Sequence, residues 1–226
     1  MDQVEMKIAA AREALHEVRD GMRLGLGTGS TAAELVRVLA EARGRGEFAN
    51  IRCTCTSQNT EEQARSLGIP TFRLVDVEPL DLAIDGTDAI DDKLRLIKGG
   101  GGALLREKIV EQAARRFIVI ADETKVVETL SGRALPVEVT PFAREILERR
   151  FAAMDLDPVV RMRDGKIRIT DEGHHILDVR IPRDQDIADV VARIRDNAGV
   201  VETGFFPREA TEAIIATSDG LRRMRR

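Results

Sequence analysis

The sequence predicts an α/β protein, and three observations support that prediction. Segments with the composition of buried strands alternate with segments of helical periodicity over residues 1–129. A continuous apolar run, Phe117–Ala121, is typical of a central strand in a parallel sheet. After Leu130 the order changes to strand, helix, paired strands, helix and strand. We therefore expect a Rossmann-like parallel sheet domain with a smaller ferredoxin-like α+β domain.

Composition excludes several function classes. The 226 residues are 43% hydrophobic and 33% charged, as in ordinary globular proteins. Lys plus Arg number 35 and Asp plus Glu number 39, so bulk positive charge cannot attract nucleic acid. Trp and Tyr are absent, which leaves few platforms for base stacking. No apolar run reaches the ~18 residues of a membrane span, and the N-terminus is polar. We expect a cytoplasmic protein without nucleic-acid or membrane partners.

The chain opens with an expected amphipathic helix over residues 5–19. Apolar residues recur there at helical spacing: Ile8, Ala11, Leu15 and Val18. Lys7 lies near the start of this helix, and it is assigned to solvent unless that helix end borders a site. A short strand, Met22–Gly27, follows.

The turn Thr28-Gly29-Ser30-Thr31 joins this strand to a helix expected over residues 32–42. Backbone N–H groups, hydroxyls and a positive helix end converge at such a turn, which predicts a phosphate cradle. A P-loop is excluded, because the Lys it requires is missing. A dinucleotide fingerprint matches weakly, because the second strand ends in Ser57-Gln58-Asn59 where an acid is needed. A small phosphate-bearing ligand fits best, and a tight turn without a ligand is the alternative.

The second strand, Ile51–Thr56, contains both cysteines of the chain. Cys53 and Cys55 point to the same side of that strand, as small buried hydrophobes do. C-x-C without further Cys lacks the spacing of a zinc site. A helix is expected from Ser57 to Gly68, and Phe72–Val75 is a candidate third strand.

Acidic residues crowd the end of the next strand, Leu80–Ile84, and they are Asp81, Asp85, Asp88, Asp91 and Asp92. Two of them frame the turn Asp85-Gly86-Thr87-Asp88, which directly follows the strand. An oxygen-ligand metal site is one alternative. It is disfavoured, because no His or Glu falls at ligand spacing and the calcium-loop pattern is missing.

A lysine and four glycines, Lys98 and Gly99–Gly102, precede a helix expected over residues 103–115. Each glycine would cost a helix roughly 1 kcal/mol relative to Ala, so the run indicates backbone that approaches a ligand closely. The expected buried line of the helix is Leu105, Ile109 and Ala113. Glu107 lies off that line, which places it in solvent or in a site. Lys125 follows the Phe117–Ala121 strand, at the same sheet edge as the two earlier turns.

The second half predicts the smaller domain, residues 130–205, while residues 1–129 and 206–226 form the larger one. Its expected elements are a strand at 135–139, a helix at 142–151, a hairpin at 159–169, a strand at 176–181, a helix at 187–196 and a strand at 200–205. The segment Ala213–Ala216 is expected to return to the first sheet. The Arg-rich C-terminal end is read as a solvated tail.

Three strand ends thus bring together a phosphate cradle, two aspartates, two lysines and a glutamate. His16, His174 and His175 lie outside this set, which argues against a His-based acid or base. The set suits proton transfer next to a carbonyl group. A carboxylate removes a carbon-bound proton, and positioned cations or donors hold the charge that develops on oxygen.

The chain also resembles a known family, and nearly all of it takes part in the resemblance. Several stretches are similar to signature motifs of the ribose-5-phosphate isomerase A family: Gly25–Ala32, Asp85–Asp88, Lys98–Lys108, Ala121–Lys125, Leu135–Val139 and Gly199–Phe206. The lysine–glycine–glutamate stretch is the most specific of them. Thr87, Ala89 and Thr124 depart from the usual pattern, and Ala89 removes a possible third acid from the aspartate turn.

The resemblance implies an aldose–ketose isomerase that interconverts ribose 5-phosphate and ribulose 5-phosphate without a metal or organic cofactor. Glu107 is then the base that moves a proton between C1 and C2 through an enediolate. Asp85 assists ring opening, Asp88 handles hydroxyl protons, and Lys98 stabilises the enediolate oxygen. The implied substrate-binding residues are Thr28, Gly29, Ser30, Thr31, Asp85, Gly86, Thr87, Asp88, Lys98, Gly99, Gly100, Gly101 and Lys125, with Lys7 as a further contact to the phosphate.

The resemblance also implies a homo-oligomer, either a dimer or a tetramer. Two other functions stay open on the sequence. A non-catalytic sugar-phosphate sensor is disfavoured by the intact acid/base set and by the lack of a DNA-binding appendage. A nucleotide-binding enzyme is the third possibility, and ligand-binding assays distinguish it.

Overall fold

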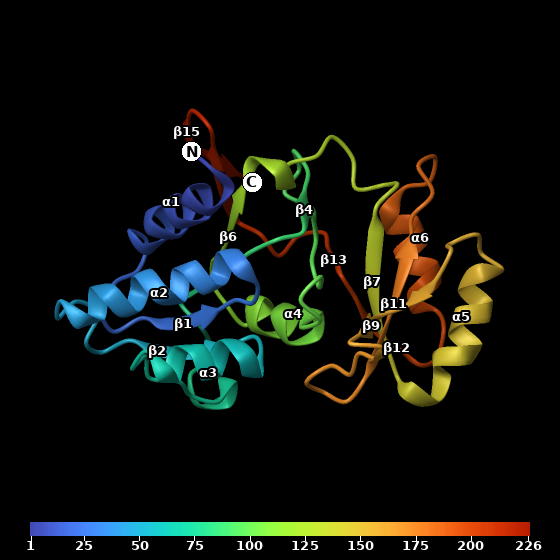
Figure 1. The fold of residues 1–226 in the computed structure, drawn as a ribbon, viewed down its shortest axis with the longest axis horizontal. Coiled ribbons are helices and arrows are strands. Elements are labelled where there is room, and N and C mark those ends of the chain that lie inside the picture. Colours follow the sequence, from blue (N-terminus) through green and yellow to red (C-terminus); the bar gives the residue numbers. More distant parts are fainter.

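A six-stranded sheet forms the larger part of the molecule (Figure 1), in a computed structural model that describes residues 1–226. Its strand order is β15-β14-β6-β3-β1-β2, and every neighbouring pair is parallel except β14 with β15. The strands are β1 (Arg23–Leu26), β2 (Arg52–Cys55), β3 (Leu82–Asp85), β6 (Phe117–Asp122), β14 (Glu212–Thr217) and β15 (Gly220–Arg225). The predicted α/β class with a parallel sheet is confirmed.

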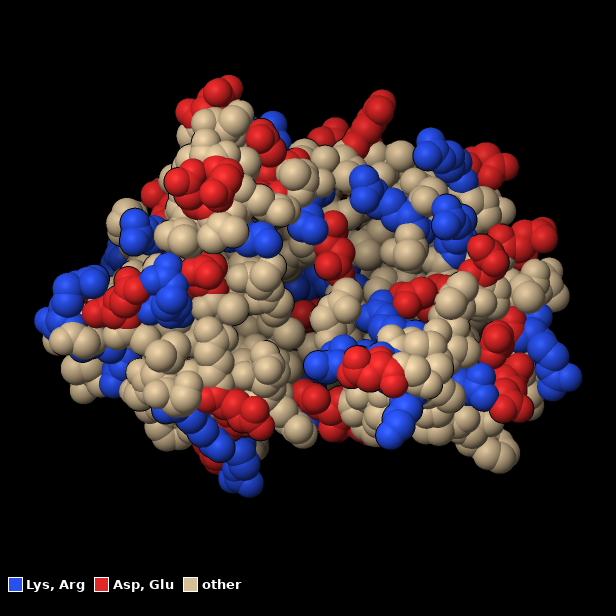
Figure 2. All heavy atoms as spheres, in the orientation of Figure 1, with Lys and Arg blue, Asp and Glu red and all other residues tan.

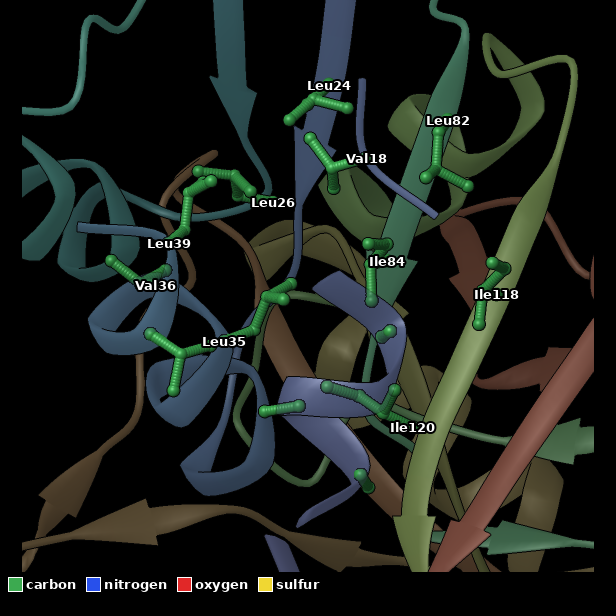
Figure 3. Close-up of a cluster of buried hydrophobic side chains, with 14 of the residues drawn as sticks. Val18, Leu24, Leu26, Leu35, Val36, Leu39, Leu82, Ile84, Ile118 and Ile120 are labelled. Carbon is green, nitrogen blue, oxygen red and sulfur yellow. The ribbon is translucent and has the colours of Figure 1, made fainter. Parts of the chain in front are cut away.

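The helices of this part are α1 (Gln3–Leu15), α2 (Ser30–Gly44), α3 (Gln58–Ser66) and α4 (Leu104–Gln112). Figure 3 shows apolar side chains of α2 and of the central strands meeting in one buried cluster, with α1 beside them. Strand β6 contributes to both sides of the sheet, because Ile118 and Ile120 face this cluster while Val119 faces another. Burial on both faces explains why the strand is apolar throughout.

Helix α1 packs closely through small residues. It buries Met6, Ala10, Ala11 and Ala14, whereas the expected core residues Ile8 and Leu15 are only partly buried. Alanines let a helix approach the sheet closely. The buried face of α1 is therefore centred on its alanines, and not on the large apolar residues from which the sequence analysis predicted it. No helix in the molecule is long and apolar enough to cross a membrane.

A second, antiparallel sheet has the order β12-β7-β11-β8. Its elements are β7 (Ala134–Val139), α5 (Arg144–Ala152), β8 (Val159–Val160), β11 (His175–Arg180), α6 (Ile187–Arg195) and β12 (Val200–Thr203). If these strands are numbered by their order in the chain, they lie side by side in the sheet as 4-1-3-2. Helix α5 connects the first strand to the second, and α6 connects the third to the fourth, which is the ferredoxin-like arrangement. A hairpin of β9 (Met162–Arg163) and β10 (Lys166–Ile167) extends from this sheet.

A small three-stranded sheet joins the two larger ones, and the sequence patterns did not predict it. It consists of β4 (Ala89–Ile90), β5 (Leu96–Ile97) and β13 (Phe205–Phe206), in the order β13-β5-β4. Two-residue strands have no measurable periodicity, so they leave no pattern in the sequence. The apolar side chains nevertheless pack against the clusters of both larger sheets.

Two predicted elements are wrong. Phe72–Val75 is not a strand: only Thr71 bridges the sheet, and Leu74–Asp76 form a 3-10 helix. An ion pair between Arg73 and Asp76 stabilises that local turn. The Arg-rich end is not a solvated tail, because it forms the edge strand β15 beside β14.

The charges of β15 explain why it is ordered. Arg223 pairs with Glu13 at 2.7 Å, Glu17 at 2.8 Å and Glu212 at 2.7 Å, which ties the C-terminus to α1 and β14.

The cysteine prediction holds for Cys53, which is buried, and in part for Cys55, which is half-buried. Burial raises the pKa of each thiol to about 12, so both are protonated near neutral pH.

Candidate active site

One pocket gathers nearly all of the residues predicted from the sequence. Its lining consists of Thr28, Gly29, Ser30, Thr31, Gly86, Thr87, Asp88, Lys98, Gly99, Gly100, Gly101, Glu107 and Lys125. The loops after β1, β3 and β6 and the start of α2 supply most of these residues, because the carboxyl ends of parallel strands meet at one edge of a sheet. Lys98–Gly101 follow β5, and Glu107 lies on α4. Two predicted residues, Asp85 and Lys7, do not line the pocket.

The start of α2 forms the cradle at one side of this pocket. Gly29 is its N-cap residue, with φ 106° and no side-chain cap, so the first N–H groups of the helix are free to bind an anion. The Thr28 hydroxyl lies in a hydroxyl cluster, 2.7 Å from that of Thr56 and 2.8 Å from that of Ser57. This cluster fixes the turn, and Ser30 stays exposed on its open side.

Lys98 lies under the pocket at the centre of a buried charge cluster and is only 2% exposed. Its Nζ donates to the Gly86 carbonyl at 2.6 Å and pairs with Asp85 Oδ2 at 2.9 Å. Asp85 Oδ1 accepts from the backbone N–H groups of Thr28, at 2.9 Å, and Gly86, at 2.6 Å. Asp85 therefore holds the two turns and Lys98 together from below.

Helix α4 brings Glu107 to the same cluster. Glu107 Oε1 lies 3.7 Å from Lys98 Nζ, and Oε2 is buried without a hydrogen-bond partner. The expected buried line of this helix is wrong, because Ile109 is 46% exposed while Glu107 is 3% exposed. The helix turns its charged face inward, where Lys98 compensates part of the cost of burying carboxylates.

Glu111 is a third carboxyl group in the cluster, and sequence reasoning missed it. It is 2% exposed, its Oε1 lies 3.4 Å from Lys98 Nζ, and neither oxygen has a hydrogen-bond partner. Its position four residues after Glu107 places both on one helix face, which is the only signal that the sequence contains.

Burial sets the acidities of this cluster. Burial raises the pKa of Glu107 to about 8, with the charges of Asp85 and Asp88 adding to the effect and Lys98 opposing it. Burial likewise raises the pKa of Glu111 well above its usual range. Burial alone would lower the pKa of Lys98, but the three surrounding carboxyl groups outweigh it, so the pKa is raised and Lys98 stays charged.

Asp88 lies at the open side of the pocket, where it is exposed. Its Oδ2 accepts a hydrogen bond from Gly100 N–H at 2.7 Å, so the glycine loop and the aspartate turn are linked. The Thr87 hydroxyl donates to the backbone oxygens of Ala89 and Ile97, at 2.8 and 3.0 Å, and thereby anchors the turn to β4 and β5.

The remaining lysines differ in position. Lys125 lies on the short 3-10 helix after β6 and lines the pocket, whereas Lys7 lies on α1 and does not. Positive and negative side chains are interspersed over the face seen in Figure 2. No group of three or more His, Cys, Asp or Glu side chains has an arrangement that could hold a metal ion.

The arrangement can perform proton transfer on a small phosphorylated molecule. Free N–H groups and Lys125 offer sites for an anion, and Glu107 offers a carboxyl oxygen with no protein partner. Lys98 places a fixed positive charge 3.7 Å from the other oxygen of that carboxyl group. A carboxylate base with a neighbouring cation is the pairing that formation of an enediolate requires.

Comparison with known proteins gives one consistent result. Residues 52–220 match the family model described as ribose 5-phosphate isomerase A (phosphoriboisomerase A). A protein of Sinorhizobium medicae named ribose-5-phosphate isomerase A is 48% identical, over 100% of this chain and 99% of its own length. A solved D-ribose-5-phosphate isomerase in complex with phospho-erythronic acid is 38% identical, with a TM-score of 0.95 over 100% of both chains. The ribose 5-phosphate isomerase of Plasmodium falciparum is 34% identical, with a TM-score of 0.94 over 99% of both chains.

Proposed function

The chain belongs to the ribose 5-phosphate isomerase A family and interconverts ribose 5-phosphate and ribulose 5-phosphate, and we propose that Glu107 moves the proton in this reaction. The observation that supports this role is the environment of one carboxyl group. Glu107 Oε2 has no protein partner, Glu107 lines the pocket, and Lys98 lies 3.7 Å from its other oxygen.

The proposed reaction begins on the open-chain sugar. The Glu107 carboxylate accepts the proton from C2, and the electrons of that bond form the C1=C2 double bond of the enediolate. The C1 carbonyl oxygen gains the negative charge, which the Lys98 ammonium stabilises. Asp88 carries the proton between the two hydroxyl oxygens, and Glu107 returns its proton to C1.

The substrate is proposed to bind with its phosphate at the start of α2. Free N–H groups of that helix, the Thr28–Thr31 turn and Lys125 are the contacts we assign to it, with Lys7 as a further one. Gly86, Thr87 and Gly99–Gly101 form the rest of the wall. Because Asp85 lies behind this wall, we propose that it assists ring opening through the Lys98 ammonium that it holds.

The Glu107→Gln variant tests the assignment of the base. We expect turnover to fall by about 10²–10⁴-fold, because the amide keeps the shape but cannot accept the proton. Ribose 5-phosphate should still bind, measured by calorimetry on the variant. Glu62→Gln on α3, an exposed carboxyl group outside the pocket, is the matched control and should keep full activity. Full activity of Glu107→Gln would remove Glu107 from the mechanism.

The assay is run with and without a chelator, because the reaction as proposed needs no metal or organic cofactor. We expect equal rates in both conditions. A loss of rate on chelation that added metal restores would contradict this part of the proposal.

We further propose a homo-oligomer, a dimer or a tetramer, that works in the cytoplasm in the pentose phosphate pathway. Family membership supports this proposal. Sedimentation of the purified chain tests the assembly, and a mass near the 25.0 kDa of one chain would contradict it. Cell fractionation tests the location.

A further inference from the structure

Two arginines of the smaller sheet region bind the carbonyl groups of the glycine loop. Arg161, between β8 and β9, donates through Nη1 to the Gly99 oxygen at 2.6 Å and to the Gly100 oxygen at 3.2 Å. Arg168, after β10, donates through Nη2 to the Gly101 oxygen. Figure 1 shows the hairpin that contains β9 reaching from the smaller sheet towards α4, which the glycine loop precedes.

These carbonyl contacts fix where the N–H groups of the loop point. In a trans peptide the C=O and the following N–H point in opposite directions. The Gly99 carbonyl is bound by Arg161, and the N–H of the same peptide, on Gly100, donates to Asp88 Oδ2 at 2.7 Å. The Gly100 carbonyl is also bound by Arg161, so the Gly101 N–H points away from this arginine. That N–H has no acceptor in the protein, and Gly101 lines the pocket.

Arg161 is itself held in place. Its Nε donates to Asp178 Oδ2 at 2.8 Å, and its Nη2 donates to Asp178 Oδ1. The backbone N–H of Arg161 donates to the Ile176 carbonyl at 2.9 Å, and the Arg161 carbonyl accepts from the backbone N–H of Arg168 at 2.9 Å. A planar guanidinium bound at both edges of its fork has little freedom, which suits it to orient other groups.

We propose that Arg161 is a positioning residue for the isomerase reaction. It acts through the Gly99–Gly101 carbonyls, aiming one N–H at the Asp88 carboxylate and the next at an oxygen of the bound sugar. The smaller sheet thereby completes an active site whose proposed reacting groups all lie within residues 1–129. This inference rests on the proposed function of Asp88.

The test compares Arg161→Met, Arg161→Lys and Arg163→Met. In Arg161→Met we expect kcat to fall roughly 10²-fold with KM changed much less, because misaligned groups lose transition-state stabilisation more than substrate binding. Arg161→Lys should recover part of the rate, because an ammonium can reach one carbonyl but has no planar fork. Arg163 has a 70% exposed side chain in the same hairpin, and Arg163→Met should keep the wild-type kcat.

A double-mutant cycle with Asp88→Asn separates positioning from a purely structural role. If Arg161 acts through Asp88, the two losses in kcat are less than multiplicative. Wild-type kcat in folded Arg161→Met, or fully multiplicative losses, would overturn the inference while leaving the isomerase function intact. Full activity of Asp88→Asn alone would instead contradict the proposed function.

Folding is checked by thermal unfolding of each variant. If Arg161→Met does not fold, Arg161→Lys and Asp178→Asn take its place in the cycle, since both preserve the size and polarity of the site. Wild-type kcat in both of these variants would overturn the inference.

Discussion

At the scale of single residues, the buried cluster under the pocket contains more carboxyl groups than positive charges. Lys98 supplies one positive charge to three buried carboxyl groups, Asp85, Glu107 and Glu111. With all three ionised, the cluster would carry two uncompensated negative charges away from water, which costs several kcal/mol. Protons held on Glu107 and Glu111 reduce this cost, in line with their raised pKa values. Glu107 is therefore half-titrated near pH 8.

This titration predicts a pH dependence of the reaction. Glu107 must lose its proton to act as a base, and its pKa is raised to about 8. We expect kcat/KM to rise with pH, to fall about tenfold per unit below pH 8, and to level off above it. The phosphate of the substrate titrates near pH 6, so its effect is separable. Rates that are constant from pH 6.5 to about 9 would contradict the raised pKa.

The raised pKa of Glu107 also makes the stability of the protein depend on pH. Folding raises the pKa of this carboxyl group, so its protonated form stabilises the native state. That contribution is complete at a pH below the pKa of the unfolded chain, near 4.5, and it is lost as the pH rises through about 8. Buried Glu107 therefore lowers the stability of the native state in alkaline conditions.

The sequence identified most residues of the site but not their surroundings. Glu107 and Lys98 could be predicted because they flank a glycine run with few structural uses. The burial of Glu107 could not, since helical periodicity assigns the inner face to the most apolar residues and here assigns it to Ile109. Arg161 lies 62 residues from Gly99, and no local pattern reports a contact over that distance.

At the scale of elements, the ends of β1 and β3 must approach closely to form the charge cluster. Gly27 lies directly after β1, and its N–H donates to the Ile84 carbonyl of β3 at 3.0 Å. A β-carbon at Gly27 would lie 2.0 Å from Asp85 Oδ1. The absence of a side chain there is what lets Asp85 reach the backbone of the neighbouring turn.

Gly27→Ala tests this packing. We expect a loss of about 1–3 kcal/mol in unfolding free energy from overpacking, and a fall in kcat/KM of about tenfold or more as Asp85 and Lys98 move. Gly44→Ala is the control, because a β-carbon at that helix end meets nothing within 4 Å. Urea unfolding and the isomerase assay measure both effects. Equal stability of the two variants would show that the close approach is not required.

Long strands and helices could be predicted because their periodicity spans several residues, as in β6 and β11. The elements that were missed are short or depend on partners. The strands β4, β5 and β13 have two residues each, and β15 is charged because ion pairs through Arg223, and not apolar burial, fix its position. Phe72–Val75 has the composition of a strand, but the chain turns before it can pair.

At the scale of the whole molecule, we propose that the chain divides into residues 1–129 with 206–226 and residues 130–205. The apolar cluster of the smaller sheet supports this division, because nearly all of its residues lie within 130–205 and only Ala89 and Ile97 come from the larger unit. The two units do not meet through apolar contacts alone. Lys108 on α4 is buried, and its Nζ donates to Glu202 Oε1 at 2.9 Å and to the carbonyls of Thr203 and Phe205 at 2.8 Å each.

Lys108→Met tests this connection. We expect a loss of about 3 kcal/mol in unfolding free energy, because three acceptors lose a buried charged donor. Native-state hydrogen exchange should then show different opening free energies for β7 and β11 than for β1 and β3. Lys93→Met, at an exposed lysine, is the control and should change neither. Identical exchange in both sheets of Lys108→Met would contradict the proposed division.

The central claim is that the carboxyl group of Glu107 faces the carbon-bound hydrogen of the sugar. A crystal structure of Glu107→Gln with ribose 5-phosphate tests it most directly. We expect the side-chain oxygen at position 107 within about 3.5 Å of C1 or C2, with the phosphate at the start of α2. A sugar bound with C1 and C2 away from position 107, or with the phosphate at another edge of the sheet, would contradict the account.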